Sequence, residues 1–343
     1  MKLNTMMTAM LLLPSAGAMA MSGTPDALPD QGTVNKTVRF IAVGDTGTGE
    51  DGQYKVAAAM QALCEQKGCD FALGLGDNVY ESGVDDVDDL QFVTKFEQPY
   101  AALNMPFYMT LGNHDNSWLF GGDGLDNDRG EIQVDYHYHT DRQSDKWHMP
   151  ARYYTFNAPL ADEEPLINFI SVDSNPLAAV ADADADYWQL PYKKKQAEWL
   201  DNVMETSTAP WKIVFAHHPF ISNGKHGNAG IYDGVPGAGI AYFDLLREHV
   251  CNRAQVIITG HDHDMQVLNA TDNCGKTRQI VSGAGAKTRS LQDEERNAAD
   301  WQQGDILGFF HIEVNGDAMT VTAITVDPQS GEHQEAFSTV INR

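Results

Sequence analysis

A short apolar run that ends in a charged turn occupies residues 71–80, which read FALGLGDNVY. The run Phe71–Leu75 predicts a buried strand, and Gly76 allows a sharp turn directly after it. Asp77 then follows at the strand end. In open α/β sheets, ligands bind beyond the carboxyl ends of the strands. Asp77 therefore stands where such a sheet places its functional side chains.

The same pattern occurs four more times along the chain, each time as a predicted strand, a Gly or Ala, and then a polar side chain. The predicted strands are Thr37–Val43, Phe71–Leu75, Phe107–Leu111, Trp211–Ala216 and Val256–Thr259. The side chains that follow them are Asp45, Asp77, Asn113, His217 and His261. Helical spacing of apolar residues lies between the strands, as at 53–67 and 193–204. We therefore predict an α/β fold in which the five side chains converge at one sheet edge.

The converging side chains have the chemistry of a metal site, because carboxylates and neutral imidazoles suit zinc, iron and manganese. Tyr80, His114 and His263 lie within three residues of these positions and enlarge the set. The set is too large for one tetrahedral ion, so we predict two ions bridged by Asp77. Paired ions can clamp the attacking and leaving oxygens of a phosphoryl displacement. Each motif alone is equally typical of an ordinary turn or a structural histidine, so the prediction rests on their combination.

Five motifs together resemble the calcineurin-like metallophosphoesterase superfamily. They are Asp45-Thr46-Gly47, Gly76-Asp77-Asn78-Val79-Tyr80, Gly112-Asn113-His114-Asp115, His217-His218-Pro219 and Gly260-His261-Asp262-His263. Tyr80, three residues after the bridging Asp77, narrows the resemblance to the purple acid phosphatases of the small, tartrate-resistant type. The resemblance covers residues 37–326. It implies two packed β-sheets flanked by helices, an αββα sandwich.

The resemblance also implies a dinuclear centre with one ferric iron. The implied ligands of Fe(III) are Asp45, Asp77, Tyr80 and His263. The implied ligands of a divalent iron, zinc or manganese are Asp77, Asn113, His217 and His261. The bond between ferric iron and Tyr80 would give a purple colour. The alternative for Tyr80 is a packed core tyrosine.

The predicted activity is hydrolysis of phosphate monoesters by a metal-bound hydroxide, as in an acid phosphatase. The leaving alkoxide needs a nearby acid. His114 is one candidate, and His226, nine residues after His217, resembles the family's second substrate-facing histidine; either could instead be a solvated or capping residue. Asp115 could orient His114 or a ligand, or only form the turn. The alternatives are a phosphodiesterase or nucleotidase on the same fold and a non-catalytic binding protein.

The formal net charge is −25, with 48 Asp and Glu against 23 Lys and Arg. Such a chain repels nucleic acid and anionic lipid, so we predict a small phosphate-ester substrate and neither nucleic acid nor membrane as partner. Substrate phosphates are anionic too, so the site needs the positive charge that metal ions supply. The sequence gives no indication of an oligomeric state.

The first 20 residues are typical of a secretory signal peptide: Lys2, an apolar stretch over 6–13, and Ala18-Met19-Ala20 as a cleavage site. A membrane anchor is the alternative, but spanning a bilayer takes about 20 apolar residues. We predict export to the periplasm or beyond after cleavage near Ala20. Residues 21–36 would form a flexible lead-in, and residues 37–343 a single catalytic domain.

Four cysteines in an exported chain suggest disulfides, and proximity in sequence pairs Cys64 with Cys69 and Cys251 with Cys274. Free buried thiols are the alternative; a zinc site is less favoured because no C-x-x-C spacing is present.

The stretch 116–150 shows no clear period and is predicted as a long loop or insertion that borders the substrate. Within it, His137 and His139 alternate, which favours an exposed strand; the alternative is that they reach the substrate from the loop. Asp262 and Asp264, beside the last motif, are predicted to form a solvated turn.

Overall fold

The five strands that end in potential ligands divide between two seven-stranded sheets, which confirms the α/β fold with two packed sheets. The computed structural model describes residues 36–160, 162, 164–182 and 184–343. The predicted signal peptide and the predicted lead-in, apart from Lys36, lie outside these residues.

The first sheet has the strand order β14-β13-β12-β1-β2-β3-β4. Its strands are β1 (Thr37–Val43), β2 (Phe71–Leu75), β3 (Phe107–Thr110), β4 (Trp147–His148), β12 (Leu307–Asn315), β13 (Ala318–Val326) and β14 (His333–Asn342). Strands β1 to β4 run parallel, and β12 pairs antiparallel with β1. The carboxyl ends of β1, β2 and β3 therefore meet at one edge.

The second sheet has the order β11-β9-β10-β8-β7-β6-β5. Its strands are β5 (Tyr154–Ala158), β6 (Ile167–Ser171), β7 (Trp211–Phe215), β8 (Val256–Thr259), β9 (Met265–Leu268), β10 (Arg278–Ser282) and β11 (Ala299–Gln303). Strands β6, β7, β8 and β10 run parallel, so the ends of β7 and β8 also share an edge. The hydroxyl of Ser282 donates to the carbonyl of Ala42 (2.8 Å) and joins the two sheets.

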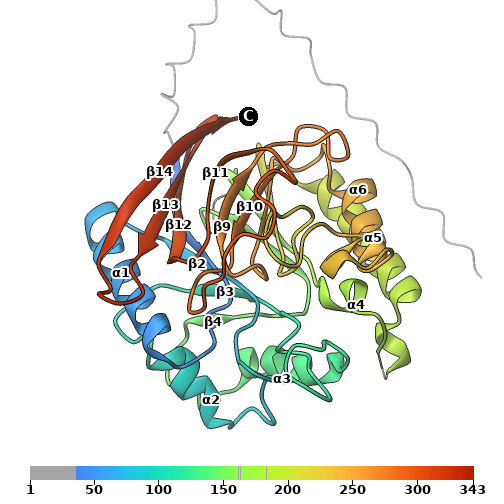
Figure 1. Ribbon diagram of the computed structural model, residues 1–343, viewed down its shortest axis with the longest axis horizontal. Coiled ribbons are helices and arrows are strands. Elements are labelled where there is room, and N and C mark those ends of the chain that lie inside the picture. The colour runs from blue at the N-terminus through green and yellow to red at the C-terminus, as the bar shows by residue number, and fades with distance from the viewer. Residues whose placement is uncertain (1–35, 161, 163, 183) are drawn as a thin grey trace, which may run out of the picture. The chain divides into compact units, whose positions relative to one another are not determined.

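Helices cover the outer faces of both sheets (Figure 1). They are α1 (Asp51–Lys67), α2 (Leu90–Phe92), α3 (Asn127–Tyr138), α4 (Asn175–Ala178), α5 (Gln189–Thr206) and α6 (Ile240–His249). A π-helical turn, Val93–Glu97, extends α2, and short 3-10 turns occupy Ala185–Tyr187 and Tyr232–Gly234. Leu200 of α5 and Leu245 of α6 are buried in one cluster with Val214 and Ile257 of the second sheet. None of the helices in the described ranges is long and apolar enough to span a membrane.

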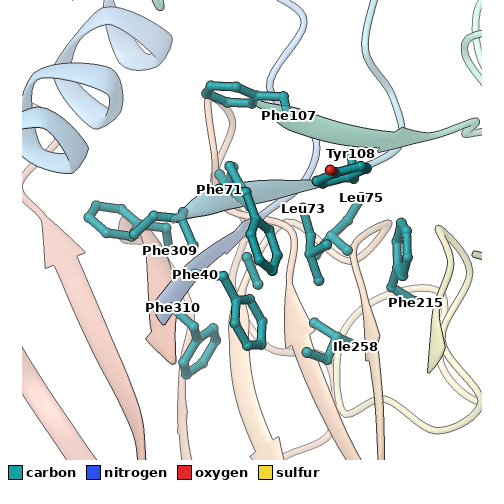
Figure 2. Packing of buried hydrophobic residues seen from close by; sticks show 14 of the residues in the cluster. Phe40, Phe71, Leu73, Leu75, Phe107, Tyr108, Phe215, Ile258, Phe309 and Phe310 are labelled. Atoms are coloured by element: carbon teal, nitrogen blue, oxygen red, sulfur yellow. The ribbon is translucent and has the colours of Figure 1, made fainter. Parts of the chain in front are cut away.

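Aromatic side chains fill the space between the sheets. Phe40 of β1 and Phe71 of β2 contact Phe169 of β6 edge-on, at ring-centroid distances of 5.0 and 5.3 Å. Figure 2 shows Phe40 on the same side of the first sheet as Phe215 and Ile258, which come from β7 and β8. Full burial of each such side chain contributes about 1.5–3 kcal/mol to folding. This packing fixes the edges of the two sheets against each other.

The prediction of a long loop over residues 116–150 was wrong, because α3 and β4 lie within it. Asp126 caps α3 by accepting the backbone N–H of Arg129. The helix lacks an apolar stripe since polar residues such as Gln133 make up much of its buried face. His137 lies on this helix and His139 follows its last residue, so the expected exposed strand is wrong as well.

Both predicted disulfides are confirmed. Cys64 of α1 pairs with Cys69 just beyond the helix, with 5.1 Å between their Cα atoms. Cys251, directly after α6, pairs with Cys274, which precedes β10.

Candidate metal centre

Three strand ends have the same unusual backbone conformation. Asp45, Asp77 and His261 follow β1, β2 and β8 after one intervening glycine, and their φ angles are 59°, 51° and 71°. Left-handed backbone costs a residue other than glycine roughly 1–2 kcal/mol. Such conformations cluster at functional sites, where the surrounding structure enforces them. The sharp turn brings each side chain to the sheet edge.

The glycines before these side chains allow neighbouring strand ends to approach closely. A Cβ atom on Gly112 would lie 2.2 Å from Oδ1 of Asp77, and one on Gly260 would lie 2.5 Å from Oδ2 of Asp45. Any larger residue would therefore displace one of the two carboxylates. Gly112 and Gly260 are thus required by packing between strand ends that are distant in sequence.

Asp45, Tyr80 and His263 form one group at this edge. The Tyr80 hydroxyl donates to Oδ1 of Asp45 (3.1 Å) and lies 3.2 Å from Nε2 of His263. Nε2 of His263 lies 3.5 Å from the same Asp45 oxygen. All three side chains are buried or nearly so. Three potential ligand atoms therefore surround one point.

Asn113, His217 and His261 form a second group. Nε2 of His217 lies 2.9 Å from Oδ1 of Asn113 and 3.0 Å from Nδ1 of His261. The other ring nitrogen of His217, Nδ1, lies 2.8 Å from the carbonyl oxygen of Leu75 and donates to it. This hydrogen bond leaves the Nε2 lone pair directed at the group, which is the usual arrangement of a metal-binding histidine.

Asp77 belongs to both groups. Its Oδ1 lies 3.5 Å from Nε2 of His217, and ligand atoms of Asp45, Asp77 and His217 lie within 4.8 Å of one another. Burial raises the pKa of Asp45; the nearby His217 opposes the rise and the Asp77 carboxylate adds to it. Each of two buried carboxylates this close disfavours the ionisation of the other, and a bound cation would offset that cost. The pair thus fits bound metal.

Burial favours the neutral form of two imidazoles in the centre, those of His261 and His263. Burial lowers the pKa of His263 to about 4, and the positive charge of Arg289 contributes. Burial also holds the pKa of His261 well below its usual value. Neutral imidazole is the form that binds metal ions. Burial, and then Asp45, raise the pKa of the Tyr80 hydroxyl well above its usual value, so a phenolate here requires a strong cation as partner.

His114 and His226 both border the centre. The backbone N–H of His114 donates to Oδ1 of Asp77 (2.9 Å), and its ring Nδ1 lies 2.6 Å from the carbonyl oxygen of Glu81. The ring of His226 lies 4.2 Å from that of His261, between centroids. The structure therefore brings together all nine residues that the sequence singled out.

A family model of calcineurin-like phosphoesterases matches residues 38–265, which include every one of these nine residues. The chain belongs to the calcineurin-like phosphoesterase family.

Two curated relatives of this phosphoesterase are acid phosphatases by name. Tartrate-resistant acid phosphatase type 5 of Mus musculus is 24% identical over 315 residues, which are 86% of this chain and 88% of the relative. Purple acid phosphatase 17 of Arabidopsis thaliana is 28% identical over 263 residues, which are 73% and 69% of the two chains. These similarities agree with the narrower resemblance to purple acid phosphatases.

Solved structures share the fold of this phosphoesterase. GAP50, described as the anchor in the inner membrane complex of Plasmodium, has a TM-score of 0.68 and 20% identity, with 89% of each chain covered. A dimetal phosphatase from Danio rerio has a TM-score of 0.54 and 14% identity, with 89% of this chain and 98% of the other covered.

A buried aspartate supports the segments of the phosphoesterase that carry the candidate ligands. Asp115 accepts the backbone N–H groups of Asn78, Val79 and Gly112 at 2.8–3.1 Å, which ties the end of β2 to the end of β3. It therefore positions the ligand-bearing loops and does more than form a turn.

The predicted solvated turn at Asp262 and Asp264 was wrong, since both side chains are buried. Asp262 accepts the backbone N–H of His226 (2.8 Å) and fixes that loop. Asp264 accepts from the side-chain amide of Gln266 (2.6 Å).

Sequence reasoning missed three residues of the site. Lys287 and Arg289 follow β10 after a run of Gly and Ala; Nζ of Lys287 lies 3.5 Å from the centroid of the Tyr80 ring. The small residues after a sixth strand, β10, were the available signal. His218 is buried, and its Nδ1 lies 2.8 Å from the Ser174 hydroxyl.

Proposed function

We propose that this protein hydrolyses phosphate monoesters at a dinuclear metal site, as an acid phosphatase. One observation carries the proposal: two groups of potential ligands from five strand ends share one carboxylate. The proposed ligands are Asp45, Asp77, Tyr80, Asn113, His217, His261 and His263. The names of the acid phosphatase relatives support the same activity.

Fe(III) at the tyrosine-containing group and a divalent iron, zinc or manganese at the other group are the proposed metals. When bound, the two ions would lower the pKa of a water molecule and polarise the phosphoryl oxygens. Tyr80 supports iron because a buried phenolate needs a strong positive partner. Purified protein should then absorb visible light, and Tyr80→Phe should bleach it while iron remains bound. An iron-loaded, active but colourless wild type contradicts the Tyr80 assignment.

His114 is the proposed proton donor to the leaving oxygen. Its Nδ1 is engaged by the Glu81 carbonyl, which leaves Nε2 free to face the site. His114→Asn should lower kcat about 100-fold or more, as for the loss of a general acid. The metal content should remain that of the wild type. Loss of metal would instead make His114 a structural residue.

His226 is the proposed second substrate-facing histidine. Its Nδ1 donates to Oδ1 of Asp233 (2.8 Å), and its Nε2 accepts from Nη1 of Arg289 (3.1 Å). The first bond fixes the ring beside His261. The second places the Arg289 guanidinium at the edge of the centre, where an anionic phosphate would meet it.

Hydrolysis of an aryl phosphate monoester and of the matching diester, from mildly acidic to alkaline pH, tests this function. Faster monoester turnover with an acidic optimum supports it. A preference for the diester at neutral or alkaline pH would make the protein a phosphodiesterase. A fully metal-loaded protein that hydrolyses neither would place it with binding proteins of this fold, a class to which the description of GAP50 as an anchor points.

Export is part of the same proposal. The amino-terminal sequence pattern and the two disulfides support export of the protein to an oxidising compartment, such as the periplasm or the medium. The charge of −25 supports a small phosphate ester as substrate and opposes nucleic acid or anionic lipid.

A further inference from the structure

A cavity of about 240 Å³ opens beside the candidate metal centre. Asn113 and His261 of the centre line one end of it, and His226 lines it as well. The cavity is therefore continuous with the position of a bound phosphate, and it offers space for the group that the phosphate leaves behind.

The wall away from the centre is largely apolar. It is made of Ala178 at the end of α4, of Ala179 and Val180 just beyond it, and of Val235 and Ala238 after the turn Tyr232–Gly234. Val180 and Val235 are 80% and 55% exposed. A ligand that covers aliphatic side chains at the mouth of a functional cavity removes apolar surface from water, which favours binding.

The fixed charges on this cavity are both negative. Asp123 and Asp233 line it, and neither lysine nor arginine is among its described lining residues. The Asp123 carboxylate is held in place by the backbone N–H groups of Trp118, Leu119 and Phe120. Lys287 and Arg289 do not line it, although Arg289 contacts the ring of His226, which does.

We propose that this cavity binds the leaving group of the substrate and selects an uncharged or cationic alcohol with an apolar face, such as a phenol. It disfavours leaving groups that carry further phosphates or carboxylates. The proposal rests on the proposed phosphomonoesterase function and narrows its substrate class away from nucleoside diphosphates and polyphosphates.

Three esters that share a phenyl phosphate core test the proposal: phenyl phosphate, 4-(aminomethyl)phenyl phosphate and 4-(carboxymethyl)phenyl phosphate. The methylene group insulates the ring, so the two charged esters have similar intrinsic reactivity. With the metal-loaded full-length mature protein, kcat/KM should be about tenfold higher for the cationic ester than for the anionic one. Equal values, or a preference for the anionic ester, overturn the proposal.

Val180 is a suitable position for a test substitution, because its exposed side chain lies on the wall of the cavity and is not one of the proposed catalytic groups. Val180→Lys adds a positive charge, and Val180→Gln is the uncharged control of similar length. Relative to Val180→Gln, Val180→Lys should shift the ratio of the two kcat/KM values about tenfold toward the anionic ester. An unchanged ratio means that the leaving group binds elsewhere.

Binding of the corresponding arylphosphonates, measured by calorimetry, separates recognition from chemistry and should follow the same order. Hydrolysis without discrimination between the charged esters refutes the leaving-group inference alone. Absence of hydrolysis of all three esters by the metal-loaded protein refutes the proposed function, and this inference with it.

Discussion

Replacement of Arg152 by methionine should destabilise the protein and loosen the loop after Asn113. The Arg152 guanidinium donates from Nε to Oδ2 of Asp173 (2.7 Å), from Nη1 to the carbonyl of Asn127 (2.6 Å), and from Nη2 to Oδ1 of Asn116 (3.1 Å). It thus ties the segment after β6 to the start of α3 and to the loop that carries a proposed metal ligand.

The magnitude follows from burial. The side chain of Asp173 is 0% exposed and that of Arg152 is 7% exposed. Methionine fills a similar volume but cannot donate, so the Asp173 carboxylate keeps only the Tyr192 hydroxyl (2.6 Å) as a side-chain donor. Removal of one partner of a buried ion pair costs about 3–5 kcal/mol. We therefore expect Arg152→Met to lower the free energy of unfolding by about that amount.

Urea unfolding of three variants beside the wild type checks the reasoning. Arg247→Met is the matched control, since Arg247 is 46% exposed and pairs with Asp244 on the surface of α6. It should cost at most about 1 kcal/mol. Arg152→Met combined with Asp173→Asn should regain part of the loss, because the unpaired charge is then gone. A loss of less than about 1 kcal/mol for Arg152→Met, equal to that of the control, would refute the argument.

Three further predictions concern the centre and the core. Gly260→Ala places a Cβ 2.5 Å from Oδ2 of Asp45, so elemental analysis should find less bound metal; wild-type content speaks against the packing argument. Arg289→Gln removes the donor to His226 and should raise KM for an aryl monoester about tenfold, as for a lost charged hydrogen bond; steady-state kinetics with an effect on kcat alone would contradict it. Burial lowers the pKa of His311 below its value of 6.5 in the unfolded chain, so the unfolded state binds more protons and stability falls as pH drops below 6.5. His311→Gln should lose less free energy of unfolding than the wild type between about pH 7 and about pH 5, and equal losses would exclude this role.

Local patterns were sufficient to predict the strand ends that build the site. Each combines an apolar run, a small residue and a ligand within a few positions, and the parallel order of β1, β2 and β3 and of β7 and β8 places these ends together. Gly112 and Gly260 are glycines for a structural reason as well, because a side chain at either position would collide with a neighbouring strand end.

Contacts between distant segments could not be predicted in this way. Gln133 is buried on α3 because its amide donates to Asp115 (2.8 Å) and its oxygen accepts from Asn78 (3.0 Å). No apolar period marks such a helix. Strands β11 and β14 are likewise edge strands rich in polar residues, and their amino-acid sequences do not alternate regularly between apolar and polar residues.

The surroundings of the two proposed catalytic histidines depend on pairings over long sequence separations. Arg289 reaches His226 across 63 residues, and Lys287 reaches Glu81 across 206. Both cations belong to a segment whose only sequence signal is a run of small residues after β10.

The number of metal ions bound per chain tests the central claim most directly. Elemental analysis of purified protein, beside Asp77→Asn, measures it. We predict two metal ions per chain in the wild type, at least one of them iron, and a large loss in Asp77→Asn because both groups share that carboxylate. One ion or none in the wild type, or full occupancy in Asp77→Asn, would contradict a dinuclear centre bridged by Asp77.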